Sequence, residues 1–211
     1  TQASIFYAIP CRDGQLTANE ISKYTEYVLE KDVKIKEAID LKDLKIRNLR
    51  EKVLMIIKAL KEMILKSHIA LPDKVCLELS HHYGIERFEE WGAAILNCIN
   101  REYCKKLIIL LPKQKHPFHH HLKKEETFQV LYGSMDVTIG REAKLLKAGD
   151  MLTVERGLRH DFSSKEGVIF EEVSTTHYND DSFYEDETIT DNKDRKTEMT
   201  LRSDWLYKSI K

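Results

Sequence analysis

The stretch that decides the fold runs from residue 119 to residue 133 and reads HHHLKKEETFQVLYG. His119 and His121 stand two positions apart, so on a β-strand both imidazoles project from the same face. Glu126 follows across a charged turn and shares its parity with apolar residues at positions 128 and 130 and with the aromatic residue at 132. We prefer it to Glu125 because only Glu126 keeps six residues between itself and Gly133, where we expect the strand to end.

A companion pattern lies downstream. We expect a hairpin to return after Gly133 toward Gly149, from which the chain reads GDMLTVERGLRH and ends at His160. The two segments together give HxHx4Ex6G followed by Gx5ExGx2H. Because the two halves occur together, in order and joined by a turn-rich hairpin, the combination is far more specific than either half alone.

These paired segments resemble the two sequence motifs of the cupin superfamily. In that family two histidines, a glutamate and a later histidine converge inside a β-barrel on one metal. The matching residues here are His119, His121, Glu126 and His160. Three positions depart from the usual pattern without removing a ligand, and they are Lys113, Glu155 and Ser164.

The chemistry of this donor set agrees with the resemblance. Three neutral imidazoles and one carboxylate suit Mn, Fe, Zn, Ni or Co, and they leave coordination positions open for water or substrate. An all-thiolate structural site is excluded. The sequence therefore predicts one divalent transition metal as the cofactor.

The pattern upstream of the motifs favours a helix followed by strands. An apolar stripe with spacings of three and four residues runs from Leu49 to Ile64 and is typical of an amphipathic helix that packs on a core. Asn48 and Glu51 are placed as a capping box at its start, and the helix should end before Pro72. Short runs rich in β-branched and aromatic residues follow at 75–79, 93–99, 106–111, 127–132, 135–139, 151–154 and 168–173.

Many short strands punctuated by turns predict a mainly β fold. With the resemblance, this is the cupin double-stranded β-helix, or jelly-roll barrel. We divide the chain into a small segment at 1–47, a helical connector at 48–72, the barrel at 73–178 and an acidic C-terminal strap at 179–211.

The polar residues outside the motifs receive plainer interpretations. Residues 179–200 are typical of a solvated tail or strap, and the acidic run 179–181 lacks the ligand spacing of a calcium loop, so we expect it to be solvated. His81 and His82 are expected on the surface or in a loop. Apolar residues near the end would dock this region or join a dimer contact, and they are Leu201, Trp205, Leu206 and Ile210.

Composition limits the partners. The 34 Lys and Arg residues balance 35 Asp and Glu residues, so the sequence has no general attraction to nucleic acid or anionic lipid. No apolar run is long enough to span a bilayer, and four scattered cysteines do not form a disulfide framework, so we expect reduced thiols and a cytoplasmic protein. The chain opens at Thr1 without an initiating Met, which is consistent with a piece of a longer protein.

Two further resemblances suggest an activity. Residues 123–126 and 170–174 resemble the corresponding segments of cupin-type D-lyxose ketol-isomerases, in which a lysine and a glutamate flank the metal and handle protons. By position these are Lys124 and Glu172. The resemblance implies that Glu172 is the base and Lys124 its acid partner in an aldose–ketose isomerisation.

The second resemblance covers nearly the whole chain. Residues 79–84, 98–104, 125–133 and 174–178 resemble the C-terminal cupin region of some N-acetylneuraminate synthase-like proteins, and residues 28–44 resemble their antifreeze-like (SAF) domain. This implies a sugar or sugar acid as ligand and an attached synthase barrel as a partner. The condensing barrel is not part of this sequence, so synthase activity cannot be assigned to these residues.

Three hypotheses follow. We favour a metal-dependent sugar isomerase or epimerase in nonulosonate metabolism. A non-catalytic, metal-dependent sugar-binding or regulatory module and an oxygen-dependent dioxygenase are the alternatives. A homodimer is expected by analogy with other cupin barrels.

Overall fold

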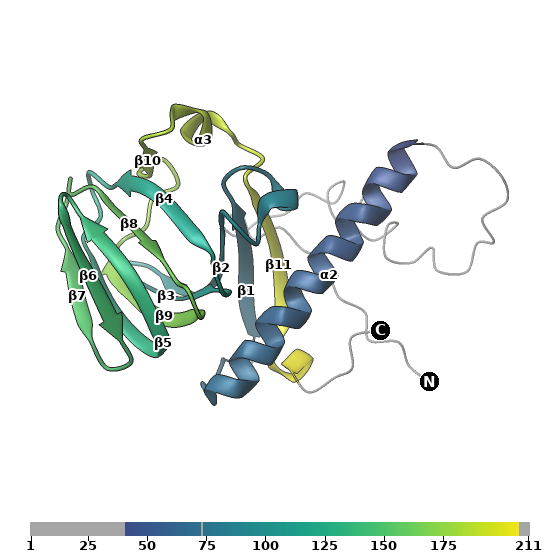
Figure 1. Cartoon of the computed structure of the whole chain (residues 1–211), viewed down its shortest axis with the longest axis horizontal. Coiled ribbons are helices and arrows are strands. Elements are labelled where there is room, and N and C mark those ends of the chain that lie inside the picture. Colours follow the sequence, from purple (N-terminus) through teal and green to yellow (C-terminus); the bar gives the residue numbers. More distant parts are fainter. Residues whose placement is uncertain (1–40, 73, 207–211) are drawn as a thin grey trace, which may run out of the picture.

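A computed structural model of the chain describes residues 41–72 and 74–206. A long helix, α2 (Leu41–Ser67), lies along one side of an antiparallel β-structure (Figure 1). The strands are β1 (Lys74–His81), β2 (Gly92–Asn100), β3 (Tyr103–Leu110), β4 (Lys115–His120), β5 (Glu126–Ile139), β6 (Glu142–Lys147), β7 (Met151–Val154), β8 (His160–Ser163), β9 (Val168–Thr175), β10 (Phe183–Tyr184) and β11 (Lys196–Arg202). The short helical segments are η1 (Ile85–Arg87), α3 (Glu187–Asp191) and η2 (Ser203–Leu206).

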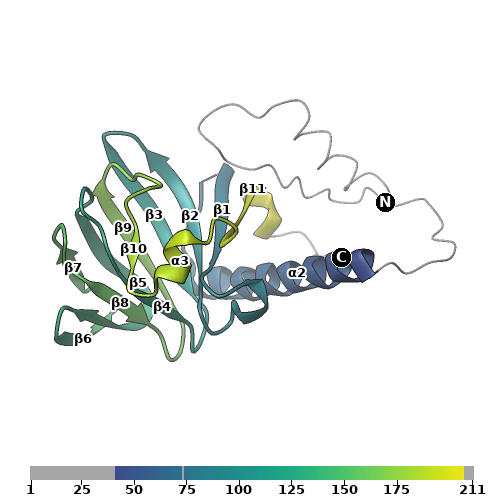
Figure 2. The same ribbon diagram turned by 90° about the horizontal axis from the view of Figure 1, so that it is seen from above.

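The strands form one curled sheet in the order β10-β4-β8-β5-β9-β3-β2-β1-β11. Strand β5 connects the two halves of this sheet, because the first part of β5 pairs with β9 and β7 and the second part pairs with β8 and β6. Seen from above, the sheet curls into a half-barrel with α2 outside it (Figure 2). The mainly β cupin-type fold predicted from the sequence is confirmed.

Alternation along the strands separates two apolar cores. On β1, Leu77 and Leu79 face outward and pack with Ile56 and Leu60 of α2, which explains the helical stripe in the sequence. Between them, Glu78 turns to the inside of the half-barrel and lines its cavity. The same alternation on the neighbouring strands places one apolar face under the helix and a mixed face inside.

A second core fills the inside of the half-barrel. Phe128, Phe162 and Phe170 pack there with T-shaped ring contacts at centroid distances between 5.2 and 5.9 Å. His160 lies against this cluster, with its ring centroid 6.0 Å from that of Phe128. The aromatic core therefore forms an apolar floor under the histidines.

Two element boundaries differ from the sequence prediction. Helix α2 begins at Leu41, so Asn48 lies inside the helix and does not cap its start. The preceding residues are mainly Leu, Lys and Ile, which continue a helix readily. Strand β5 does not end at Gly133 but continues to Ile139, because Gly133 adopts a φ of 78° and bends the strand from one half of the sheet to the other.

The C-terminal region is docked rather than solvated. Strand β11 pairs with β1 from Lys74 to Ser80, and the core under α2 contains Met199, Leu201, Trp205 and Leu206. Five strands lie outside the apolar runs predicted from the sequence, namely β4, β6, β8, β10 and β11, and of these only β4 was implied by the spacing of His119 and His121.

Some sequence predictions are left as they were. Residues 1–40 of the SAF-like segment and Ile210 lie outside the described part of the chain. The division into domains stays a prediction. Among the described helices, none combines the length and the apolar character needed to cross a bilayer.

Candidate metal centre

The curled sheet brings the four predicted ligands together. His119 lies near the end of β4, His121 just beyond it, and Glu126 and His160 begin β5 and β8. His119 and His160 face each other as register partners of β4 and β8. One ligand atom from each of the four residues can be chosen so that all lie within 4.8 Å of one another, and all four side chains are buried.

Backbone carbonyls orient the three histidines. The Nδ1 atoms of His119 and His160 each donate a hydrogen bond at 3.0 Å, to Pro117 O and Leu158 O, and Nδ1 of His121 donates to Asp181 O. A carbonyl can only accept, so the proton sits on Nδ1 in each ring. The Nε2 lone pairs are therefore free to bind a cation, and this type of outer contact is common around histidine ligands.

Two buried atoms in the cluster lack hydrogen bonds. Glu126 Oε2 and His160 Nε2 lie 3.2 Å apart, yet neither makes a hydrogen bond to another group. His121 Nε2 is 3.5 Å from the same carboxylate oxygen. Buried polar atoms normally find partners, so converging atoms without them fit a cation between the four residues. The donor set suits a divalent transition metal and does not specify which one.

The protonation states also favour a cation. Burial, followed by the neighbouring imidazoles, holds the pKa of His119 well below its usual value, and burial lowers the pKa of His121 to about 4. Burial alone would raise the pKa of Glu126, but the Lys124 ammonium and the nearby histidines outweigh it and lower that pKa well below the usual range. At neutral pH His119 and His121 are thus neutral and Glu126 is a carboxylate, the forms that bind metals.

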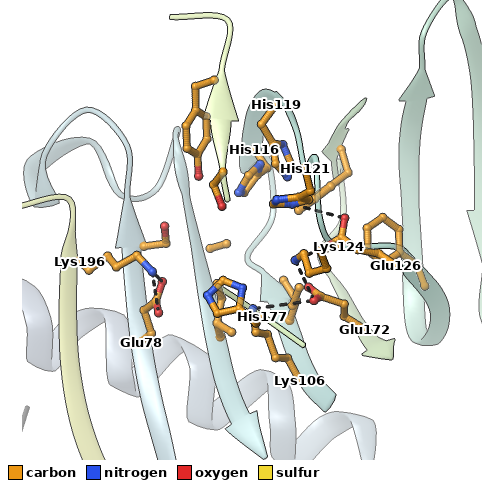
Figure 3. A pocket seen from close by; sticks show the side chains of 18 of the residues that line it. Glu78, Lys106, His116, His119, His121, Lys124, Glu126, Glu172, His177 and Lys196 are labelled. Atoms are coloured by element: carbon orange, nitrogen blue, oxygen red, sulfur yellow. Dashed lines mark hydrogen bonds and ion pairs between the residues drawn. The ribbon is translucent and has the colours of Figure 1, made fainter. Parts of the chain in front are cut away.

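The two predicted catalytic residues lie beside this cluster. Lys124 and Glu172 are both buried, and Lys124 Nζ is 3.1 Å from Glu172 Oε1 while it also contacts Glu126 (Figure 3). Burial lowers the pKa of Lys124, but Glu126 and Glu172 together raise it above its usual value. Lys106 Nζ lies 3.8 Å from Glu172, so the charges of Lys106 and Lys124 balance those of Glu172 and of the candidate ligand Glu126.

The candidate ligands and the catalytic pair line one cavity of about 50 Å³, enough for a few water molecules. Figure 3 shows His119 and His121 on one side of the cavity and the ion pair of Glu78 and Lys196 on the other. The ring of His177 lies between them. The far side is built by the C-terminal region, since Ser182, Tyr184 and Arg195 also line the cavity.

Several buried residues near the cavity were not predicted from the sequence. His81 and His82 were expected on the surface or in a loop; both are buried, and of the two only His82 lies in a turn, directly after β1. The ring of His82 packs edge-on against that of His116 at 4.4 Å, and His116 packs at the same distance from His119. The residue pattern could have suggested Lys106, because it shares parity with Ile108 and Leu110 on an otherwise apolar strand face.

Asp181 overturns a second expectation. Its side chain is 1% exposed, whereas we expected the acidic run 179–181 to be solvated. Its carboxylate accepts hydrogen bonds from the backbone N–H groups of Leu122, Lys123 and Lys124 at 3.0 to 3.1 Å. The carboxylate therefore holds the loop that joins two of the candidate ligands, His121 and Glu126.

Comparisons with known proteins agree with this geometry. A family model described as a cupin domain matches residues 106–171, which include all four candidate ligands. The solved structure of L-ribose isomerase from Cellulomonas parahominis is similar to this chain, with a TM-score of 0.55 and 15% identity over 69% of this chain and 95% of that one. At this identity the likeness shows the fold alone.

Two other solved structures are similar over shorter stretches. The Cnp3 cupin domain of Schizosaccharomyces pombe has a TM-score of 0.38 and 17% identity over 40% of this chain and 65% of that one. KdgF from Halomonas sp. has a TM-score of 0.40 and 13% identity over 42% of this chain and 83% of that one. No curated protein sequence matches this chain.

Proposed function

This chain carries a cupin domain, and from that premise we propose that it is a metal-dependent enzyme that converts a sugar or sugar acid between its aldose and ketose forms. The observation that carries the proposal is the buried pair of Lys124 and Glu172 beside the four candidate ligands. This isomerisation moves a proton from one carbon to its neighbour, so it needs acid and base groups within reach of the bound sugar.

His119, His121, Glu126 and His160 would hold the metal. When bound, a divalent cation supplies Lewis-acid polarisation of two adjacent sugar oxygens. The Nδ1 hydrogen bonds keep the three imidazoles in the tautomer that this role requires. The apolar floor of Phe128, Phe162 and Phe170 limits water on one side of the site.

The proton steps fall to the catalytic pair. Glu172 would take the proton from the carbon beside the carbonyl and return it to the neighbouring carbon. Lys124 would give a proton to the first oxygen and recover one from the second, so that the pair ends in its starting state. Ser174 Oγ donates to Glu172 Oε1 at 3.2 Å and Lys106 lies near the same oxygen, so these two residues position the base.

The finer assignments are part of the same proposal. We place the activity in nonulosonate metabolism because of the resemblance to the C-terminal region of N-acetylneuraminate synthase-like proteins. By its name, the L-ribose isomerase of Cellulomonas parahominis carries out this class of reaction on a similar fold. A homodimer, an attached synthase barrel and a cytoplasmic location stay predictions.

The test combines a substrate screen with a matched pair of variants. Metal-loaded protein is incubated with aldoses, ketoses and nonulosonic acids, with and without a chelator, and the products are identified by NMR. We expect chelation to abolish turnover and Glu172→Gln to lower it by about 10²- to 10⁴-fold. Glu171→Gln is the control, because the neighbouring glutamate contacts Lys105 outside the cavity and should keep wild-type turnover.

Three outcomes would count against the proposal. Full turnover in Glu172→Gln would remove the base from the mechanism. Metal-dependent sugar binding by the wild type without any turnover would select a binding module. Strict dependence of activity on oxygen would select an oxygenase.

A further inference from the structure

The part of the cavity built by the C-terminal region contains a buried cation without a carboxylate partner. Arg195 lines the cavity and is 9% exposed. Its Nη1 donates a long hydrogen bond of 3.5 Å to the Tyr184 hydroxyl, and its Cζ lies 5.0 Å from the centroid of the Tyr184 ring. Within the described part of the chain, the guanidinium forms no ion pair.

The other cations of the cavity differ in this respect. Lys124 is paired with Glu126 and Glu172, Lys106 lies 3.8 Å from Glu172, and Lys196 lies 3.1 Å from Glu78. Four cationic side chains thus face three carboxylates in the lining, and a divalent metal would add to the excess of positive charge. A buried charge is costly without a partner, so the unpaired guanidinium points to an anion that is part of a ligand.

Arg195 is held in a defined position relative to the candidate metal centre. The backbone N–H of His81 donates to Arg195 O at 2.8 Å, which fixes the residue at the end of β1. The Tyr184 ring lies between the guanidinium and the ligand cluster, because it also stacks on the His119 ring at 5.5 Å and 24°. Because His119, Tyr184 and Arg195 all line the same cavity, one ligand could reach both places past the edge of this ring.

His177 provides an independent observation in the same cavity. Its Nδ1 is buried and makes no hydrogen bond, and Figure 3 shows the ring directed into the cavity. Burial, together with the nearby lysines, lowers the pKa of His177 to about 2, so the ring is neutral at physiological pH and can donate one hydrogen bond. A polar ligand would satisfy this atom.

We propose that Arg195 binds the carboxylate or phosphate of an anionic sugar whose other end lies at the candidate metal centre. A guanidinium fork matches both groups with two parallel hydrogen bonds, which a lysine cannot do. The sugar part of this inference rests on the function proposed above. The anion site itself is argued from Arg195 and His177 and does not require isomerisation.

The experiment measures binding to the metal-loaded protein by calorimetry. The probes are D-glucose, D-glucuronate and D-glucose 6-phosphate, which share one sugar ring, and acetate and inorganic phosphate, which have none. The proteins are wild type, Arg195→Gln, Arg195→Lys, and Arg141→Gln as a control that removes one exposed positive charge outside the cavity. Thermal unfolding without any anion is recorded for each variant.

We expect one of the two charged sugars to bind wild type at least tenfold more tightly than D-glucose. Tighter glucuronate assigns a sugar acid, and tighter glucose 6-phosphate assigns a sugar phosphate. Arg195→Gln should remove the preference, Arg195→Lys should keep part of it, and Arg141→Gln should keep all of it. Because Arg195→Gln removes an unpaired buried charge, its melting temperature should not fall without anions.

Two results would overturn the inference. One is the absence of any anion binding by wild type, and the other is anion binding that Arg195→Gln leaves unchanged. The two proposals fail separately. If no sugar binds or isomerises, but Arg195→Gln weakens the binding of phosphate or acetate at least tenfold, then the anion site stands and the isomerase proposal falls.

Discussion

Replacing Asp181 with asparagine should loosen the loop that joins two candidate ligands. The Asp181 carboxylate accepts three backbone N–H groups at 3.0 to 3.1 Å while almost fully buried. Hydrogen bonds to a charged group contribute about 1.5 to 3 kcal/mol each, and contributions at one group are not additive. Asparagine keeps one acceptor and turns an NH2 group toward the amides, so we expect a loss of about 2 to 4 kcal/mol in the free energy of unfolding.

Metal affinity should change as well. The loop leads from His121 to Glu126, and changes behind the ligands typically lower metal affinity about 10- to 100-fold. Urea denaturation of the chelated protein gives the stability, and metal titration gives the affinity. Asp180→Asn is the control, because the Asp180 side chain is 76% exposed and, among the described residues, pairs only with Lys123 at 3.3 Å. This substitution should change the free energy of unfolding by less than about 0.5 kcal/mol. If Asp181→Asn behaved like this control in both assays, the proposed anchoring of the loop would be refuted.

Three further predictions follow from the same structure. His160→Ala should reduce metal affinity by more than the roughly 100-fold expected for changes behind the ligands. The affinity is measured by competition titration with a chelator, and a wild-type value for the variant would remove His160 from the ligand set. The chelated protein should lose stability below pH 6.5, because burial lowers the pKa of His82 to about 3 and of His121 to about 4 in the fold, so only the unfolded chain takes up protons there. The slope approaches about 1.4 kcal/mol per pH unit for each such histidine, and equal urea midpoints at pH 7 and pH 5 would contradict it. Gly133→Ala should destabilise the fold by about 2 kcal/mol or more, since a Cβ at a φ of 78° would collide with the facing backbone. Gly140→Ala is the control, because its Cβ meets open space, and it should cost about 1 kcal/mol. Equal losses of the two variants in thermal unfolding would contradict the bend at position 133.

The residues that could be predicted from the sequence are those whose placement depends on local periodicity. Alternation along a strand puts His119 on the same face as His121, and Glu126 on the same face as Phe128, whatever the rest of the chain does. The preference for Glu126 over Glu125 agrees with the structure, in which Glu126 is buried and Glu125 faces Arg156 at 3.5 Å. The later histidine was predicted from the resemblance of its segment to the second cupin motif, and β8 then brings it opposite His119.

The start of α2 and the bend in β5 show where local patterns are insufficient. A capping box at Asn48 is only one of several possible starts, and the helix extends past it to Leu41. A glycine after a strand normally indicates a turn, but Gly133 pairs with Val168 of β9 and the next residue, Ser134, pairs with Lys147 of β6, so the strand bends and continues. Pairing partners decide such cases, and they are distant in the sequence.

The sequence by itself determined the mainly β character of the chain and the set of residues that converge as candidate metal ligands. Only the tertiary structure decided the other half of the cavity, which Tyr184 and Arg195 supply from a segment that is acidic and polar in sequence. Composition predicts solvation for such a segment because polar groups are costly to bury alone. The fold offsets that cost with partners far away along the chain, as when Asp181 accepts hydrogen bonds from backbone groups 57 to 59 residues earlier, and no local pattern contains that information.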